Sequence, residues 1–96
     1  MKIMQFLDQL SKVIEDRRDN PREGSYTCYL FASGEDEILK KIGEEAVEVI
    51  LAAKGQGHQR IVEEVSDLLY HVLVLLSLKR VNLDEIEEEL RRRHGK

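Results

Sequence analysis

Residues 35–79 read EDEILKKIGEEAVEVILAAKGQGHQRIVEEVSDLLYHVLVLLSLK, and this stretch decides the fold. Apolar residues recur in it every three or four positions on both sides of the break Gly55-Gln56-Gly57. This period predicts two amphipathic helices, residues 35–54 and 58–79, joined by a tight turn. A turn this short makes the second helix run antiparallel to the first, so we expect a central helix hairpin.

The sequence before the hairpin predicts two more helices. Residues 3–17 repeat apolar side chains with helical spacing. Residues 18–25 form a loop, since they hold the one proline of the chain. Ser25 is placed to cap a short helix over 26–33, which Gly34 would end.

The sequence after the hairpin predicts a last helix that begins at Asn82. Glu85 follows three residues later, the spacing of a capping box. We therefore expect a single all-α domain over residues 1–96, a four- to five-helix bundle built around the antiparallel central helix hairpin.

Composition excludes several other classes of protein. The chain of 96 residues has 15 Lys and Arg against 19 Asp and Glu, a formal charge of −4, which lacks the basic footprint of a general nucleic-acid binder. Cys28 is the single cysteine, so a disulfide framework and a cysteine-ligated zinc site are excluded. We find neither a signal peptide nor an apolar run of about 20 residues. We expect a cytoplasmic protein that binds neither nucleic acid nor membrane.

The segment 68–78, LLYHVLVLLSL, is apolar on almost every side. A helix of this kind has to be buried all round, and a chain of 96 residues has few elements with which to surround it. We therefore predict a homodimer in which a second copy covers this helix. A central helix buried within one monomer is the alternative.

Two acidic clusters flank the turn of the hairpin. Glu45 and Glu48 precede residue 56 by the same numbers of residues by which Asp67 and Glu64 follow it, so Glu48 should face Glu64 and Glu45 should face Asp67. Each pair is spaced i, i+3 and shares one helix face. Four carboxylates crowded near a core are costly unless a cation neutralises them, and oxygen ligands suit Mg²⁺ or Mn²⁺.

Two other interpretations compete with a magnesium site. Most Glu pairs at this spacing are solvated helix faces. A di-iron bundle would need Glu-x-x-His pairs, whereas His71 follows Asp67 by four residues and Glu64 by seven.

The motifs resemble those of a known family. One set is similar to the signature of the all-α nucleoside triphosphate pyrophosphohydrolases, the MazG-like superfamily: Lys41-x-x-Glu44-Glu45-x-x-Glu48 and Glu64-x-x-Asp67. A second set resembles, more narrowly, the phosphoribosyl-ATP pyrophosphohydrolases of histidine biosynthesis: Ser25-Tyr26-Thr27 and Asp67-Leu68-Leu69-Tyr70-His71.

The resemblance implies an enzyme that uses Mg²⁺ to hydrolyse the α–β phosphoanhydride of phosphoribosyl-ATP, with Mn²⁺ as a substitute. The products would be phosphoribosyl-AMP and pyrophosphate, in the second step of the pathway. The next enzyme, a zinc cyclohydrolase, would be a separate chain and a candidate partner. Two alternatives stay open: a housecleaning (d)NTP pyrophosphohydrolase of the same superfamily, and a non-catalytic helical dimerisation module.

The resemblance also assigns roles to residues. Glu45, Glu48, Glu64 and Asp67 would bind the metal. Glu44 would orient or deprotonate water, or hold a second ion. Residues expected to contact substrate are Ser25, Tyr26, Thr27, Lys41, Arg18 and Arg22.

Each of these side chains also has a structural alternative. Ser25 can cap the short helix, and Lys41 can form an i, i+4 salt bridge with Glu45. His71 would hydrogen-bond a metal-binding carboxylate, or else sit in the core, and Tyr70 is placed in the same way. We expect the site to lie at the boundary between two subunits.

Overall fold

The computed structural model describes residues 2–95, which form five α-helices and no strand. The predicted helix ends lie within two residues of the observed ones, so the all-α prediction is confirmed. The helices are α1 (Ile3–Asp19), α2 (Tyr26–Ser33), α3 (Glu35–Gly55), α4 (His58–Leu78) and α5 (Leu83–His94).

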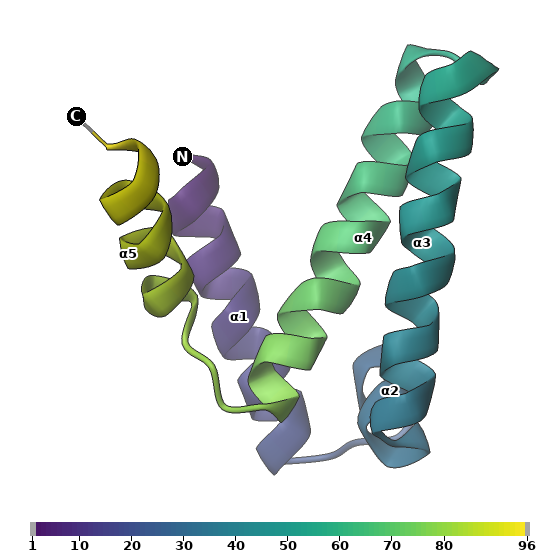
Figure 1. Ribbon diagram of the computed structural model, residues 1–96. Helices are drawn as coiled ribbons and strands as arrows, with labels where there is room; N and C mark the ends of the chain where they lie inside the picture. The colour runs from purple at the N-terminus through teal and green to yellow at the C-terminus, as the bar shows by residue number, and fades with distance from the viewer. Residues whose placement is uncertain (1, 96) are drawn as a thin grey trace.

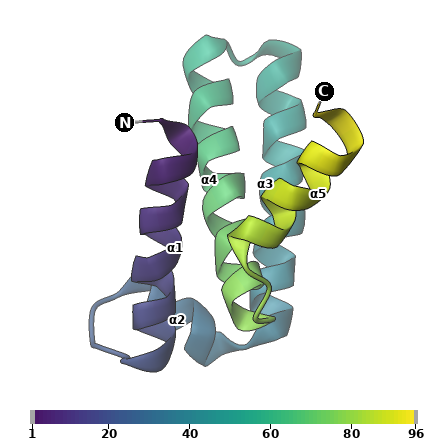
Figure 2. The same ribbon diagram turned by 90° about the vertical axis from the view of Figure 1, so that its left-hand side faces the viewer.

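The two longest helices, α3 and α4, have 21 residues each and lie side by side in both views (Figures 1 and 2). The Gly55-Gln56-Gly57 segment joins them at one end. Gly57 has a φ of 92°, a backbone conformation that residues with a Cβ rarely adopt. A glycine at this position therefore allows α4 to begin directly after α3 ends.

The short helix α2 lies at the opposite end of this pair, beside the start of α3 (Figure 1). The Ser25 hydroxyl caps it by accepting a hydrogen bond from the Cys28 amide at 3.2 Å, as predicted. Gly34, with a φ of 97°, is both the C-cap of α2 and the N-cap of α3. The chain thus reverses between α2 and α3 within one residue.

The last helix begins at the predicted capping box. The backbone amide of Asp84 donates to the Asn82 side chain, and the Glu85 carboxylate accepts from the Asn82 amide at 2.8 Å. α1 and α5 lie on the other side of α4 and diverge from the α3–α4 pair towards their free ends (Figure 1).

The buried core is small and is formed by residues of α1, α2, α3 and α4. Its five members are at most 5% exposed: Ile14, Leu30, Ile38, Leu73 and Val74. Because Leu73 and Val74 lie within one turn of Tyr70 and His71, this core fixes the C-terminal half of α4. That half contains Tyr70, His71 and Ser77, which are discussed below.

The chain leaves much apolar surface uncovered. Its accessible surface is 6882 Å², against about 5,700 Å² expected for a monomer of this mass. Its radius of gyration is 14.5 Å, against about 12.5 Å expected. On α3 and α4, seven large apolar residues are between 37% and 60% exposed: Leu39, Val47, Ile50, Leu51, Val62, Val65 and Leu69.

None of the helices in residues 2–95 combines the length and the apolar character that crossing a membrane requires.

Candidate metal centre

Three carboxylates from the paired helices come together. Glu45 of α3 and Glu64 and Asp67 of α4 each offer one oxygen, and these oxygens all lie within 4.8 Å of one another. Glu64 and Asp67 share a face of α4 because they are spaced i, i+3. Glu64 is buried, Glu45 is half-buried and Asp67 is exposed, so the cluster opens to solvent on the Asp67 side.

The cluster is electrostatically strained. Burial raises the pKa of Glu45 above its ordinary value, and hydrogen bonding with the Glu64 carboxyl and the charges of Asp67 and Glu64 act in the same direction. His71 opposes the shift more weakly. Ionised carboxylates this close cost free energy in the folded state unless a proton or a cation neutralises them.

Arg60 supplies part of that neutralisation. Its guanidinium Nη2 lies 2.7 Å from Oε1 of Glu64 and its Nη1 lies 2.6 Å from Glu63. Arg60 was not predicted as part of the site, although its i, i+4 spacing to Glu64 is the signal that would have found it. Since Arg60 is about half exposed, it can move aside when another cation binds Glu64.

The cluster fits a hard divalent cation. It contains three carboxylates and neither histidine nor cysteine. Oxygen ligands are the preference of Mg²⁺ and Mn²⁺, whereas iron and zinc sites in proteins commonly include nitrogen or sulfur donors. The donor set therefore favours the magnesium interpretation over the di-iron one.

Other predicted members of the site lie beside the cluster. Glu48 is half-buried on α3 and is not among the three converging carboxylates, although its charge acts on Arg60. Glu44 is exposed and its Oε1 lies 3.9 Å from Nζ of Lys41. Lys41 was expected to pair with Glu45 if it had only a structural role; it pairs with Glu44 instead, because the Glu45 carboxylate turns towards α4.

The three hydroxyl groups of Ser25, Tyr26 and Thr27 all have partners within the protein. Ser25 caps α2, as described above. The Tyr26 hydroxyl lies 2.9 Å from Nε2 of His71, and the Thr27 hydroxyl is hydrogen-bonded to that of Tyr70. The start of α2 is therefore fastened to α4 one turn beyond Asp67.

His71 agrees with the structural one of its two predicted roles, a place in the core. A hydrogen bond to a metal-binding carboxylate was the other, whereas its Nδ1 lies 2.8 Å from the backbone carbonyl oxygen of Asp67. The side chain is only 5% exposed. The reason is its i+4 spacing from Asp67, which brings the ring over that carbonyl rather than over the side chain.

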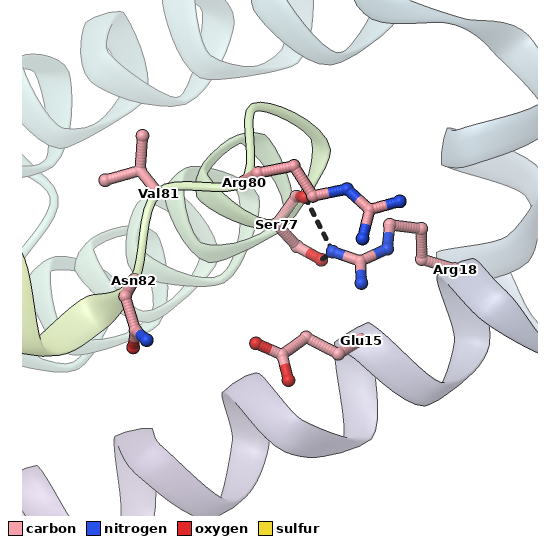
Figure 3. A pocket seen from close by; sticks show the side chains of 6 residues that line it. All are labelled: Glu15, Arg18, Ser77, Arg80, Val81 and Asn82. Atoms are coloured by element: carbon pink, nitrogen blue, oxygen red, sulfur yellow. Dashed lines mark hydrogen bonds between the residues drawn. The ribbon is translucent and has the colours of Figure 1, made fainter.

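Arg18 and Arg22 lie apart from the three carboxylates. Arg18 Nη1 donates to the carbonyl and the hydroxyl oxygen of Ser77 at 2.8 and 2.9 Å (Figure 3). Its Nε donates to Asp19. Ser77 lies about 15 Å along α4 from Asp67. Arg18 thus ties the end of α1 to the end of α4, while Arg22 is 60% exposed and lies 3.6 Å from Asp16.

An all-helical domain that gathers carboxylates from two paired helices has the arrangement expected of an all-α nucleoside triphosphate pyrophosphohydrolase. Comparison with known proteins narrows this class. The family model described as phosphoribosyl-ATP pyrophosphohydrolase matches residues 7–94. The chain belongs to this family, which confirms the resemblance seen in its motifs.

Individual relatives agree with the family match. The chain is 53% identical to a phosphoribosyl-ATP pyrophosphatase of Clostridium botulinum over 91% of its own length and 79% of the relative. It is 52% identical to the protein of the same name from Lactiplantibacillus plantarum, over 97% and 88%. It is also 51% identical to the histidine biosynthesis bifunctional protein HisIE of Oceanobacillus iheyensis, over 96% of this chain and 43% of that protein.

The raised pKa of Glu45 predicts a pH-dependent stability effect. The folded state binds a proton at Glu45 more tightly than the unfolded state, whose value is near 4.5, so stability falls as pH rises above that value. Glu45→Gln removes this penalty. In EDTA, calorimetry should give Glu45→Gln a higher Tm than wild type at pH 7 and little difference at pH 4. The exposed Glu88→Gln is the control, and a lower Tm of Glu45→Gln at pH 7 would contradict the assignment.

Proposed function

We propose that this chain hydrolyses the α–β phosphoanhydride of phosphoribosyl-ATP to phosphoribosyl-AMP and pyrophosphate in histidine biosynthesis. Family membership and the names of the relatives support the substrate and the reaction. The observation that carries the chemistry is the convergence of Glu45, Glu64 and Asp67 within 4.8 Å. Cleaving a bond between two phosphates requires neutralisation of oxygen charge, which an acidic cluster provides only by holding cations.

We propose Mg²⁺ as the cofactor, replaceable by Mn²⁺. Glu45, Glu64 and Asp67 would hold it, with Glu48 as a fourth ligand from the next turn of α3. When bound, such an ion withdraws charge from the phosphate oxygens and so makes the phosphorus easier to attack. The ion pair between Arg60 and Glu64 would then break, and the Arg60 guanidinium would contact solvent or a substrate phosphate.

Other charged side chains with solvent access suit the remaining tasks. Glu44 is exposed one residue from Glu45, where a carboxylate can orient the attacking water. Lys41 lies one helical turn earlier. Its ammonium group, which is near the exposed Glu44 carboxylate, could bind a substrate phosphate instead. Arg22, 60% exposed in the loop before α2, is the second cation that we assign to substrate binding.

We also propose that the protein acts as a homodimer. In support, the chain exposes about 1,200 Å² more surface than a typical monomer of its mass. Between α1, α4 and α5 lies a hollow of about 230 Å³ that is lined by apolar residues, with Glu87 the one charged residue of the lining. Its lining includes Met4, Leu7, Leu69, Val72, Ile86 and Leu90. With α3 paired antiparallel to one side of α4, the side of α4 that lines this hollow would pack against the second copy. The substrate site would then lie at the boundary between the two subunits.

We place the reaction in the cytoplasm and expect a cyclohydrolase to take up its product. The bifunctional relative from Oceanobacillus iheyensis supports this expectation, since its name describes two activities of histidine biosynthesis in one protein.

A substrate panel tests the proposed function. Purified protein should release pyrophosphate from phosphoribosyl-ATP with Mg²⁺, and much more slowly from ATP or dATP or in EDTA. Asp67→Asn and Glu48→Gln should each lower turnover at least about 100-fold while the circular dichroism spectrum is unchanged. The control is Glu88→Gln on α5. Equal turnover of ATP and phosphoribosyl-ATP would favour the (d)NTP pyrophosphohydrolase alternative. Full activity of both Asp67→Asn and Glu48→Gln would contradict the proposed metal site.

The oligomeric state is tested separately by light scattering. Wild-type protein at micromolar concentration should have twice the chain mass of 11.2 kDa. Leu69→Glu places a charge on the uncovered side of α4 and should give a monomer or an unfolded chain. A folded wild-type monomer at that concentration would refute the dimer.

A further inference from the structure

The hydroxyl group of Tyr26 is placed in an unusual way for an exposed tyrosine. The residue is 47% exposed, yet its oxygen points inward to Nε2 of the buried His71 at 2.9 Å. The two rings meet edge to face, with centroids 5.8 Å apart and planes at 90°. The ring of Tyr26 is therefore partly in solvent, while its hydroxyl group is hydrogen-bonded to His71 instead of to water.

The hydrogen positions in this contact follow from the chemistry of the partners. Nδ1 of His71 lies 2.8 Å from the Asp67 carbonyl oxygen, and a carbonyl can only accept, so Nδ1 carries a hydrogen. In the neutral ring Nε2 is then an acceptor, and the Tyr26 hydroxyl donates to it. A directed chain of hydrogen bonds runs from Tyr26 through His71 to the backbone of Asp67.

A second hydrogen bond runs parallel to the first. The hydroxyl groups of Thr27 and Tyr70 are hydrogen-bonded to each other, and Thr27 is only 9% exposed. Two consecutive residues of α2 thus bind two consecutive residues of α4. Because two adjacent contacts prevent rotation as well as separation, the first turn of α2 and this turn of α4 are held as one unit.

This unit borders the carboxylate cluster. Burial raises the pKa of the Tyr26 hydroxyl, and the charges of Tyr70 and Glu45 act in the same direction. His71 in turn acts on Glu45. The carbonyl that His71 contacts belongs to Asp67, one of the three clustered residues.

We propose that Tyr26 is a positioning residue of the metal centre and that it acts through His71. Its hydroxyl holds the imidazole against the Asp67 backbone and thereby fixes the turn of α4 from which the Asp67 carboxylate projects. The Ser25-Tyr26-Thr27 segment serves the site by fastening α2, rather than by donating its hydroxyl groups to substrate. This inference rests on the proposed function, because it takes the cluster to be a cation site.

Tyr26→Phe and Tyr29→Phe form a matched pair for the test. Both residues are on α2, both are about half exposed and their rings stack with centroids 6.0 Å apart. Within residues 2–95 the Tyr29 hydroxyl has no hydrogen-bond partner, whereas that of Tyr26 binds His71. Each substitution removes a single oxygen atom, so both variants should fold.

The experiment measures Mn²⁺ binding to metal-free protein by isothermal titration calorimetry, well below the Tm of every variant. Loss of one hydrogen bond of ordinary strength should weaken Mn²⁺ binding by Tyr26→Phe about three- to tenfold, and Tyr29→Phe should bind as wild type. His71→Gln should weaken binding too, and adding Tyr26→Phe to it should have little further effect, since both act through one contact.

Three results would overturn the proposed role of Tyr26 or the metal centre on which it depends. An unchanged Mn²⁺ affinity of Tyr26→Phe would overturn the proposal even if its Tm fell, because the contact would then be structural only. Additive effects of the two substitutions would show that Tyr26 does not act through His71. If wild-type protein binds no Mn²⁺, the proposed metal centre fails first. That result is distinct from a wild type that binds and a Tyr26→Phe variant that binds equally well.

Discussion

The packing of α3 against α4 brings three carboxylates together, and the rest of the site depends on this crowding. Burial and the neighbouring carboxylates Glu64 and Asp67 raise the pKa of Glu45, so the ionised cluster raises the free energy of the folded chain. Arg60 relieves the repulsion only in part, from a half-exposed position. In the proposed function, a cation bound at this cluster would stabilise the fold and so link folding to the binding of the ion.

The packing contacts that support the cluster lie on one side of it. The buried core is at the α2 end of the α3–α4 pair, where Leu73 and Val74 fix the C-terminal half of α4. From there α2 reaches Tyr70 and His71 through two hydrogen bonds. Elsewhere α3 and α4 carry exposed apolar residues, and these are the residues that the proposed second copy would cover.

Local sequence signals predicted the helices well, because each signal acts within a few residues. Ser25, Gly34 and Asn82 mark helix ends through contacts with the next turn, and those contacts form as expected. The pairing of carboxylates across the hairpin was less predictable. Spacing from the turn fixes the height of a residue along its helix but leaves the rotation about the helix axis undetermined. Glu45 therefore meets both Glu64 and Asp67, while Glu48 lies outside their contact.

Side-chain partners were harder still to foresee. The hydroxyl groups of Tyr26 and Thr27 find partners more than 40 residues away, and no local rule selects among distant candidates. Arg18 was assigned to substrate because it flanks the loop, and its contact with Ser77 at the end of α4 was not foreseen. Long-range contacts of this kind depend on how the helices are packed, which the periodicity of a sequence does not specify.

The proposed function requires Glu45, Glu64 and Asp67 to form a divalent cation site. Anomalous diffraction from crystals grown with Mn²⁺ tests it directly, because it locates the ion without assuming any ligand. We expect one strong anomalous peak with oxygen atoms of all three carboxylates roughly 2.0–2.3 Å away. A protein that hydrolyses phosphoribosyl-ATP with Mn²⁺ but binds the ion elsewhere, or shows no peak at this cluster, would contradict it.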